Sequence, residues 1–226
     1  MPLQIVGAGL GRTGTTSLTA ALEQLLGGRC YHFGEVFERP ADIDVWHDIV
    51  RTGAKPDWRA LFEGYEASND WPAAAYWKDI AAAFPEARVL LSTRETADKW
   101  YASYSKTITP LLLDTARYNH PAHDMARAVT FATFTNDLID PAAVKRRYEE
   151  HNHYVRSCVP STRLIEWTPG DGWTPLCAAL GLPEPEQEFP HLNTTDEFRE
   201  GNKLNRKPPT TVKRVTRLVR RVIPKR

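Results

Sequence analysis

The feature that most constrains the fold is a glycine-rich loop between an apolar strand and a helix near the N-terminus. Residues 5–18 read Ile-Val-Gly-Ala-Gly-Leu-Gly-Arg-Thr-Gly-Thr-Thr-Ser-Leu. Gly9 and Gly14 have the Gly-x4-Gly spacing of a phosphate-binding loop, in which backbone N–H groups and the N-terminus of the following helix surround phosphate oxygens. The segment therefore predicts an anion site within an α/β fold.

The residues around the second glycine differ from those of nucleoside-triphosphate hydrolases. Those loops continue Gly-Lys-Ser/Thr, with the Lys on the phosphates and the hydroxyl on Mg²⁺. This chain reads Gly14-Thr15-Thr16, and its cation comes earlier, at Arg12. Such an Arg suits a phosphate whose attached group is stabilised by protein donors. We therefore expect no metal ion in the site.

A second cation follows a predicted buried strand. Residues 87–93 read Ala-Arg-Val-Leu-Leu-Ser-Thr, an aliphatic run typical of a parallel strand, and the next residue is Arg94. Ligands of such sheets bind at the carboxyl ends of the strands. A kinase or GTPase tends to place an Asp for Mg²⁺ at the comparable point. Arg94 indicates a second anionic group instead.

These motifs resemble those of sulfotransferases, which transfer sulfuryl groups from 3′-phosphoadenosine 5′-phosphosulfate (PAPS). The family commonly carries Lys-Ser-Gly-Thr-Thr in its 5′-phosphosulfate loop, and residues 12–16 align with it. In the family, an Arg at the end of a strand and a Ser about two helical turns later bind the 3′-phosphate. Arg94 and Ser103 match these two residues if one residue is inserted between them, and Ser105 is an alternative to Ser103. The resemblance extends from residue 4 to about residue 205, and its further carriers are residues 30–37, 70–73, 100–101 and 189–195.

The resemblance implies an α/β three-layer sandwich with a central, mostly parallel sheet and a P-loop-like 5′-phosphosulfate loop. It implies a PAPS-dependent sulfotransferase that modifies a hydroxyl or amine of a small hydroxylated or phenolic acceptor and releases PAP, the desulfated nucleotide. It does not identify the acceptor. The residues that it assigns to the nucleotide are Gly9, Gly11, Arg12, Thr13, Gly14, Thr15, Thr16, Ser17, Arg94 and Ser103.

Catalysis requires donors on the transferred group and a base for the proton of the acceptor. Arg12 is the expected donor. Sulfotransferases place a His or Glu base just past an early strand, and His32 and Glu35 lie there; Asp70 is a third candidate. Imidazole is well matched to this work at neutral pH. Asp70 has an alternative role as a helix N-cap, because Pro72 suits the first turn of a helix.

Aromatic segments predict an apolar acceptor pocket. Tyr104, Phe131, Phe134 and residues 70–72 and 76–78 are the candidates for its wall, although most such rings belong to the core. His151 is expected close to the site.

Charge divides the chain into two parts, for which we predict a sulfotransferase-like domain at 1–207 and a basic C-terminal segment at 208–226. Residues 199–226 contain eleven Lys or Arg against one Glu. Apolar residues recur at helical spacing after Pro209. A basic amphipathic helix can cover its own domain or a second copy in a homodimer, lie on an anionic membrane surface, or attract a polyanion; nucleic acid is not expected. Lys203, Arg206 and Lys207 are further candidates to reach the nucleotide phosphate.

The remaining sequence is typical of a cytoplasmic α/β enzyme. Three cysteines without metal-type spacing indicate a reducing compartment, and no leader or membrane-spanning run is seen. The periodicity predicts strands at 3–6, 29–33, 88–93 and 163–167, and helices at 17–26, within 35–51, from 58, and at 76–84, 99–113, 120–139, 142–158 and 173–180.

Two other functions are compatible with a phosphate loop. A small-molecule kinase would need a loop Lys and an acidic Mg²⁺ ligand, and neither is present at the expected position. A non-catalytic scaffold would bind nucleotide and use the basic tail for its partners.

Overall fold

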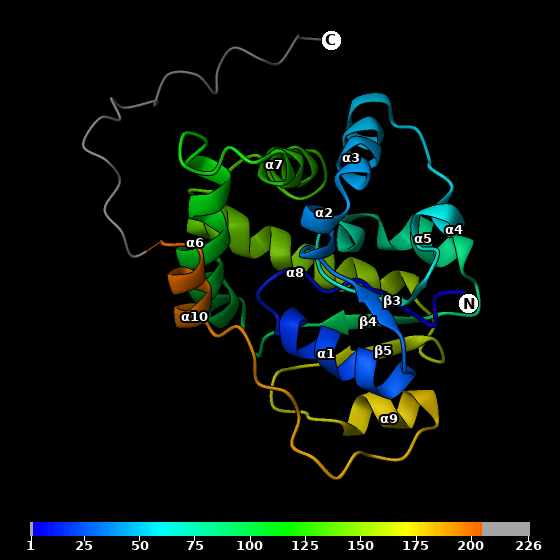
Figure 1. Ribbon diagram of the computed structural model, residues 1–226. Helices are drawn as coiled ribbons and strands as arrows, with labels where there is room; N and C mark the ends of the chain where they lie inside the picture. The colour runs from blue at the N-terminus through cyan, green and yellow to red at the C-terminus, as the bar shows by residue number, and fades with distance from the viewer. Residues whose placement is uncertain (1, 205–226) are drawn as a thin grey trace.

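Five parallel strands form the centre of the part of the chain described by the computed structural model, residues 2–204 (Figure 1). They lie in the order β2-β3-β1-β4-β5. Their bounds are Ile5–Gly7 for β1, Arg29–Tyr31 for β2, Tyr65–Ser68 for β3, Arg88–Ser92 for β4 and Leu164–Trp167 for β5. The predicted basic segment 208–226, with Arg206 and Lys207, lies outside the described residues.

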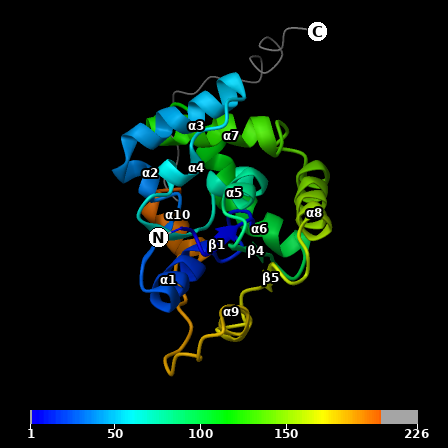
Figure 2. The same cartoon turned by 90° about the vertical axis from the view of Figure 1, so that its right-hand side faces the viewer.

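Helices cover both faces of the sheet, so the sandwich has a helical layer on each side of the central sheet (Figure 2). One face packs against α1 (Thr15–Leu26) and α9 (Thr174–Leu180). The other packs against α3 (Pro40–Thr52), α4 (Trp58–Leu61), α5 (Trp77–Ala83), α7 (Pro121–Thr133) and α8 (Pro141–Cys158). The shorter elements are α2 (Glu35–Glu38) and a 3-10 helix, Ala73–Tyr76; α6 (Ala97–Leu113) and α10 (Thr195–Gly201) pack together near the carboxyl ends of the strands.

The alternation of side chains along the strands explains why both faces are covered. Ile5 of β1 and Leu90 of β4 face the core beneath α1 and α9, whereas their neighbours Val6, Val89 and Leu91 belong to the core on the opposite face. All five are almost fully buried. A strand that is apolar on both sides needs helices on both sides. The predicted three-layer architecture is therefore confirmed.

The strand predictions are correct apart from one omission. The four predicted strands are present with ends that differ by one or two residues, but the sequence pattern missed β3. This strand reads Tyr-Glu-Ala-Ser and is buried throughout. Its Glu66 accepts a hydrogen bond from the Gln4 side chain at 2.9 Å, which allows a carboxylate to occupy a strand interior. The predicted helix at 120–139 is also too long, because α7 ends at Thr133.

The carboxyl ends of four strands bring the candidate site residues to one edge of the sheet. The glycine-rich loop follows β1, His32 follows β2, Asp70 lies two residues beyond β3, and Arg94 lies two residues beyond β4. Parallel sheets bind their ligands at this edge. In residues 2–204, none of the helices combines the length and apolarity needed to cross a bilayer.

Gly9 is fixed by the packing of the loop on β4, so we expect Gly9→Ala to destabilise the fold. A Cβ there would lie 2.7 Å from the backbone N and O of Ser92, atoms that cannot move without breaking the sheet. Overpacking of this kind costs about 1–3 kcal/mol. Chemical denaturation would measure the loss. Gly201→Ala is the matched control, because a Cβ at Gly201 meets nothing within 4 Å; an equal loss of stability in both variants would contradict the packing argument.

Candidate active site

The loop between β1 and α1 lies in the wall of an open cavity. Gly14 precedes the first residue of α1 with φ 91°, a left-handed conformation in which a Cβ would also approach the Trp167 ring to 2.9 Å. Thr13 is buried, and its hydroxyl forms hydrogen bonds with Leu10 O and Ser92 Oγ, both at 2.6 Å. These bonds hold the loop in place. The first N–H groups of a helix attract anions.

Two cavities meet at this loop. We call the first the loop cavity; it has a volume of about 180 Å³, and six of the predicted nucleotide-binding residues line it: Arg12, Gly14, Thr15, Thr16, Ser17 and Arg94. The second, which we call the apolar cavity, has a volume of about 260 Å³ and extends between α6, α7 and Trp71. Arg12, Thr15 and Asn193 line both cavities. A group held at Arg12 can therefore be reached from either side.

Arg12 is a buried cation at this junction. Its backbone has φ 72°, its Nε donates to Ser103 Oγ at 3.1 Å, and its guanidinium lies 4.6 Å from the centre of the Phe198 ring. Burial and the nearby charge of Arg94 lower the pKa of Arg12 to about 10, against the opposing effect of Asp70. The group is still protonated at neutral pH. A desolvated cation of this kind interacts strongly with an incoming anion.

Arg94 and Ser103 occupy different surroundings. Arg94 lines the loop cavity, and its Nε donates to the backbone oxygen of Arg12 at 3.0 Å. Ser103 is buried against Arg12 and Thr195, and it lines neither cavity in the described part of the chain. The alternative Ser105 also lies outside both cavity walls. Arg94 thus has direct access to a ligand, while Ser103 contacts the site through Arg12.

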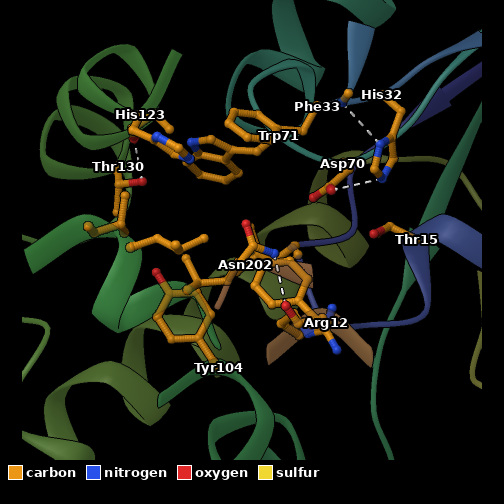
Figure 3. A pocket seen from close by; sticks show the side chains of 18 of the residues that line it. Arg12, Thr15, His32, Phe33, Asp70, Trp71, Tyr104, His123, Thr130 and Asn202 are labelled. Carbon is orange, nitrogen blue, oxygen red and sulfur yellow. Dashed lines mark hydrogen bonds and ion pairs between the residues drawn. The ribbon is translucent and has the colours of Figure 1, made fainter. Parts of the chain in front are cut away.

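His32 and Asp70 form a pair in the wall of the apolar cavity (Figure 3). His32 Nε2 lies 3.0 Å from Asp70 Oδ2, and its Nδ1 accepts the N–H of Gly34 at 3.3 Å. Burial raises the pKa of Asp70, but hydrogen bonds from His32, the Trp71 N–H and the Thr15 hydroxyl outweigh burial and hold this pKa below its ordinary value. The carboxylate is therefore ionised beside the loop.

Asp70 does not cap the following helix, so the alternative role predicted for it is wrong. Pro72 occupies the N-cap position of the 3-10 helix, without a side-chain cap. Asp70 instead has φ 66° and directs its carboxylate at His32.

Glu35 lies apart from this pair. Its carboxylate contacts the Arg29 guanidinium and the Tyr65 hydroxyl, and it lines neither cavity among the described residues. The geometry therefore favours His32 and Asp70 over Glu35 as the group that meets an acceptor.

The aromatic prediction for the apolar cavity is correct for some residues and wrong for others. Trp71, Tyr104 and Phe134 line it, whereas residues 76–78 and Phe131 do not. Tyr76 stacks on Trp46 in the core, Lys78 contacts Tyr154 at the surface, and Phe131 faces solvent. His151, expected close to the site, contacts the start of the loop, since its Nε2 lies 2.7 Å from the Ala8 oxygen, but it lines neither cavity among residues 2–204.

Residues 193–202 contribute to the site, and the sequence had predicted no site role for Asn193, Phe198 or Asn202. Asn193 accepts a bond from Arg12 through its backbone oxygen, at 3.2 Å, and donates one from its amide to Thr16 at 2.9 Å. Phe198 and Asn202 add to the wall of the apolar cavity. The polar run 193–195 was the available sequence signal, and in the structure Asn193 has φ 57°. Lys203 is exposed and lines neither of these two cavities.

Comparison with known proteins agrees with this arrangement. The family model described as a sulfotransferase domain matches residues 4–198. A relative from Aspergillus versicolor, Ava biosynthesis cluster protein M, is 30% identical over 215 residues, which cover 86% of this chain and 82% of the relative.

Proposed function

This chain belongs to the sulfotransferase domain family, and we propose that it transfers a sulfuryl group from PAPS to a hydroxyl or amine of a small molecule. The observation that carries the proposal is the junction of two cavities at Arg12 and Thr15. One cavity offers donors for an anion, and the other is apolar and begins at the His32–Asp70 pair. Transfer between two substrates requires such a shared point.

The loop cavity fits the anionic end of the nucleotide. The N-terminus of α1, the hydroxyls of Thr16 and Ser17 and the guanidinium of Arg12 would hold the phosphosulfate, and Arg94 would hold the 3′-phosphate. PAPS supplies the activated sulfuryl group when bound. Arg12 stabilises negative charge that develops during transfer, and such preorganised donors contribute about 3–4 kcal/mol each. A sulfuryl group carries less charge than a phosphoryl group, so we expect no metal requirement.

The His32–Asp70 pair would take the proton of the acceptor. Because Nδ1 accepts the N–H of Gly34, a neutral His32 carries its proton on Nε2, which lies 3.0 Å from Asp70 Oδ2. The other carboxylate oxygen of Asp70 faces the loop, since a Cβ on Gly11 would lie 3.2 Å from it. A hydroxyl placed between Asp70 and Arg12 is then next to both the base and the transferred group. The name of the relative, a biosynthesis cluster protein, agrees with a small-molecule acceptor.

Calorimetry with PAP, without metal and beside ADP and ATP with and without Mg²⁺, tests the proposal. Tight binding of PAP over ADP that is insensitive to chelator is expected. Preference for Mg²⁺-ATP would favour the kinase. PAP binding with no transfer from PAPS to any acceptor would favour the scaffold.

Arg94→Ala is expected to weaken PAP binding by about 10- to 100-fold, the effect of losing a charged hydrogen bond of about 1.5–3 kcal/mol. ADP, which lacks the 3′-phosphate, should bind both proteins alike. Arg51→Ala is the matched control, because Arg51 is exposed, pairs with Asp48 and lines neither cavity among residues 2–204. Unchanged PAP affinity in Arg94→Ala would show that the 3′-phosphate lies elsewhere.

A further inference from the structure

The apolar cavity has two chemically different ends. His32 and Asp70 stand at one end, beside Arg12 and Thr15, and His123 and Thr130 of α7 stand at the other (Figure 3). Trp71 and Tyr104 also line the cavity. The reaction uses the first end only. At the second end, a purely apolar ligand would leave His123 Nδ1 without a partner among residues 2–204.

Two buried polar atoms of this cavity have no hydrogen-bond partner among residues 2–204. They are Trp71 Nε1 and His123 Nδ1. A third such atom, His32 Nε2, makes no well-aligned hydrogen bond, but it lies 3.0 Å from the Asp70 carboxylate and so already has a polar neighbour. Buried polar groups are nearly always paired, and leaving one unpaired costs about 1–3 kcal/mol. Two such atoms in the wall of one cavity indicate groups that a ligand satisfies.

The chemistry of these atoms restricts the ligand. An indole N–H donates and cannot accept, so its partner must be an acceptor such as a carbonyl or ether oxygen. Burial, together with His120 and Arg127, lowers the pKa of His123, so this ring is neutral at neutral pH. A neutral imidazole does not require a charged partner. Aromatic contacts of His123 with Phe37 and Tyr118 fix its ring.

We propose that the acceptor is an uncharged phenol or ring-bearing alcohol with a carbonyl or ether oxygen remote from the hydroxyl to be sulfated. This inference rests on the proposed function. Trp71 Nε1–H donates to that oxygen, while the hydroxyl lies between Arg12 and Asp70. Trp71 is thereby a specificity-determining residue. The rings that line the cavity, Phe33, Tyr104 and Phe134, contact the apolar body of the acceptor.

The test compares two phenols, para-(3-oxobutyl)phenol and para-butylphenol. They differ in one carbonyl that is not conjugated with the ring, so their hydroxyls are equally acidic. Dissociation constants are measured by calorimetry on the PAP-loaded protein, for the wild type and for Trp71→Phe. We expect the wild type to bind the ketone more tightly than para-butylphenol. In Trp71→Phe, the ratio of the two dissociation constants should fall by about five- to tenfold. Phe134→Leu is the control: it alters an apolar wall and should leave the ratio unchanged.

A second measurement does not depend on the folding of the variant. In ¹⁵N-labelled wild type, which has seven Trp residues, one indole N–H resonance should move downfield with the ketone and not with para-butylphenol. Equal affinity for the two phenols with no such shift, or binding of neither, overturns the inference.

Transfer from PAPS is measured separately with both phenols. Selective ketone binding without sulfated product would refute the proposed function and leave the role of Trp71 intact. Equal binding and equal sulfation of both phenols would support the proposed function and refute the role of Trp71.

Discussion

Replacing Arg12 by Ala is expected to lower kcat by about 10²–10³-fold, with a change in PAP affinity of less than about tenfold. Arg12 stands where the two cavities meet, and burial there makes its charge effective toward the transferred group. The nucleotide keeps the N-terminus of α1 and Arg94 in the variant. The measurement is steady-state transfer from PAPS with calorimetry of PAP.

Arg12→Lys is the matched control for this prediction, because it retains the positive charge and changes its shape. It should recover part of kcat but not all, since Lys cannot form the two-pronged contacts of a guanidinium. Thermal unfolding must accompany both variants, because Arg12 also contacts Ser103 and Asn193. Loss of PAP binding equal to the loss in kcat would show that Arg12 binds the nucleotide and has no particular role in transfer.

The sequence predicted the fold and the loop well because both depend on local rules. Glycine spacing sets the loop, and continuous aliphatic runs identify strands that are buried on both faces. Arg94 follows such a run, and the structure places it in the loop cavity with Arg12 and residues 14–17. Each of these patterns lies within a short segment of sequence, so it could be recognised without knowledge of the tertiary structure.

The rest of the site depends on contacts between distant segments. β3 has no aliphatic pattern and is stabilised by its place between β1 and β2, so Asp70 could not be positioned by periodicity. Asn193 meets Arg12 across 181 positions of sequence. Tyr76 and Phe131 have the same aromatic character as Tyr104, and only packing decides which of them lines the cavity.

The ionisation of Asp70 defines the conditions for testing the base. Its pKa in the folded protein lies below the unfolded value of about 3.9. The charged carboxylate therefore stabilises the fold at neutral pH, and this contribution is lost as the pH falls through the lowered pKa. Between about pH 6 and 8 its charge is constant, so activity changes in that range report on other groups of the site.

Asp70→Asn is expected to lower kcat by about 10²–10⁴-fold, the contribution of a positioned base. The amide keeps an oxygen beside His32 Nε2 but cannot take a proton, so PAP affinity should change little. The stability contributed by the carboxylate charge is lost in the variant, and thermal unfolding measures that loss. Transfer from PAPS between pH 6 and 8 measures the effect. Glu35→Gln is the matched control, because Glu35 is a carboxylate after the neighbouring strand that contacts Arg29 and Tyr65 outside both cavities. Full activity in Asp70→Asn, or an equal loss in Glu35→Gln, would remove Asp70 from the reaction.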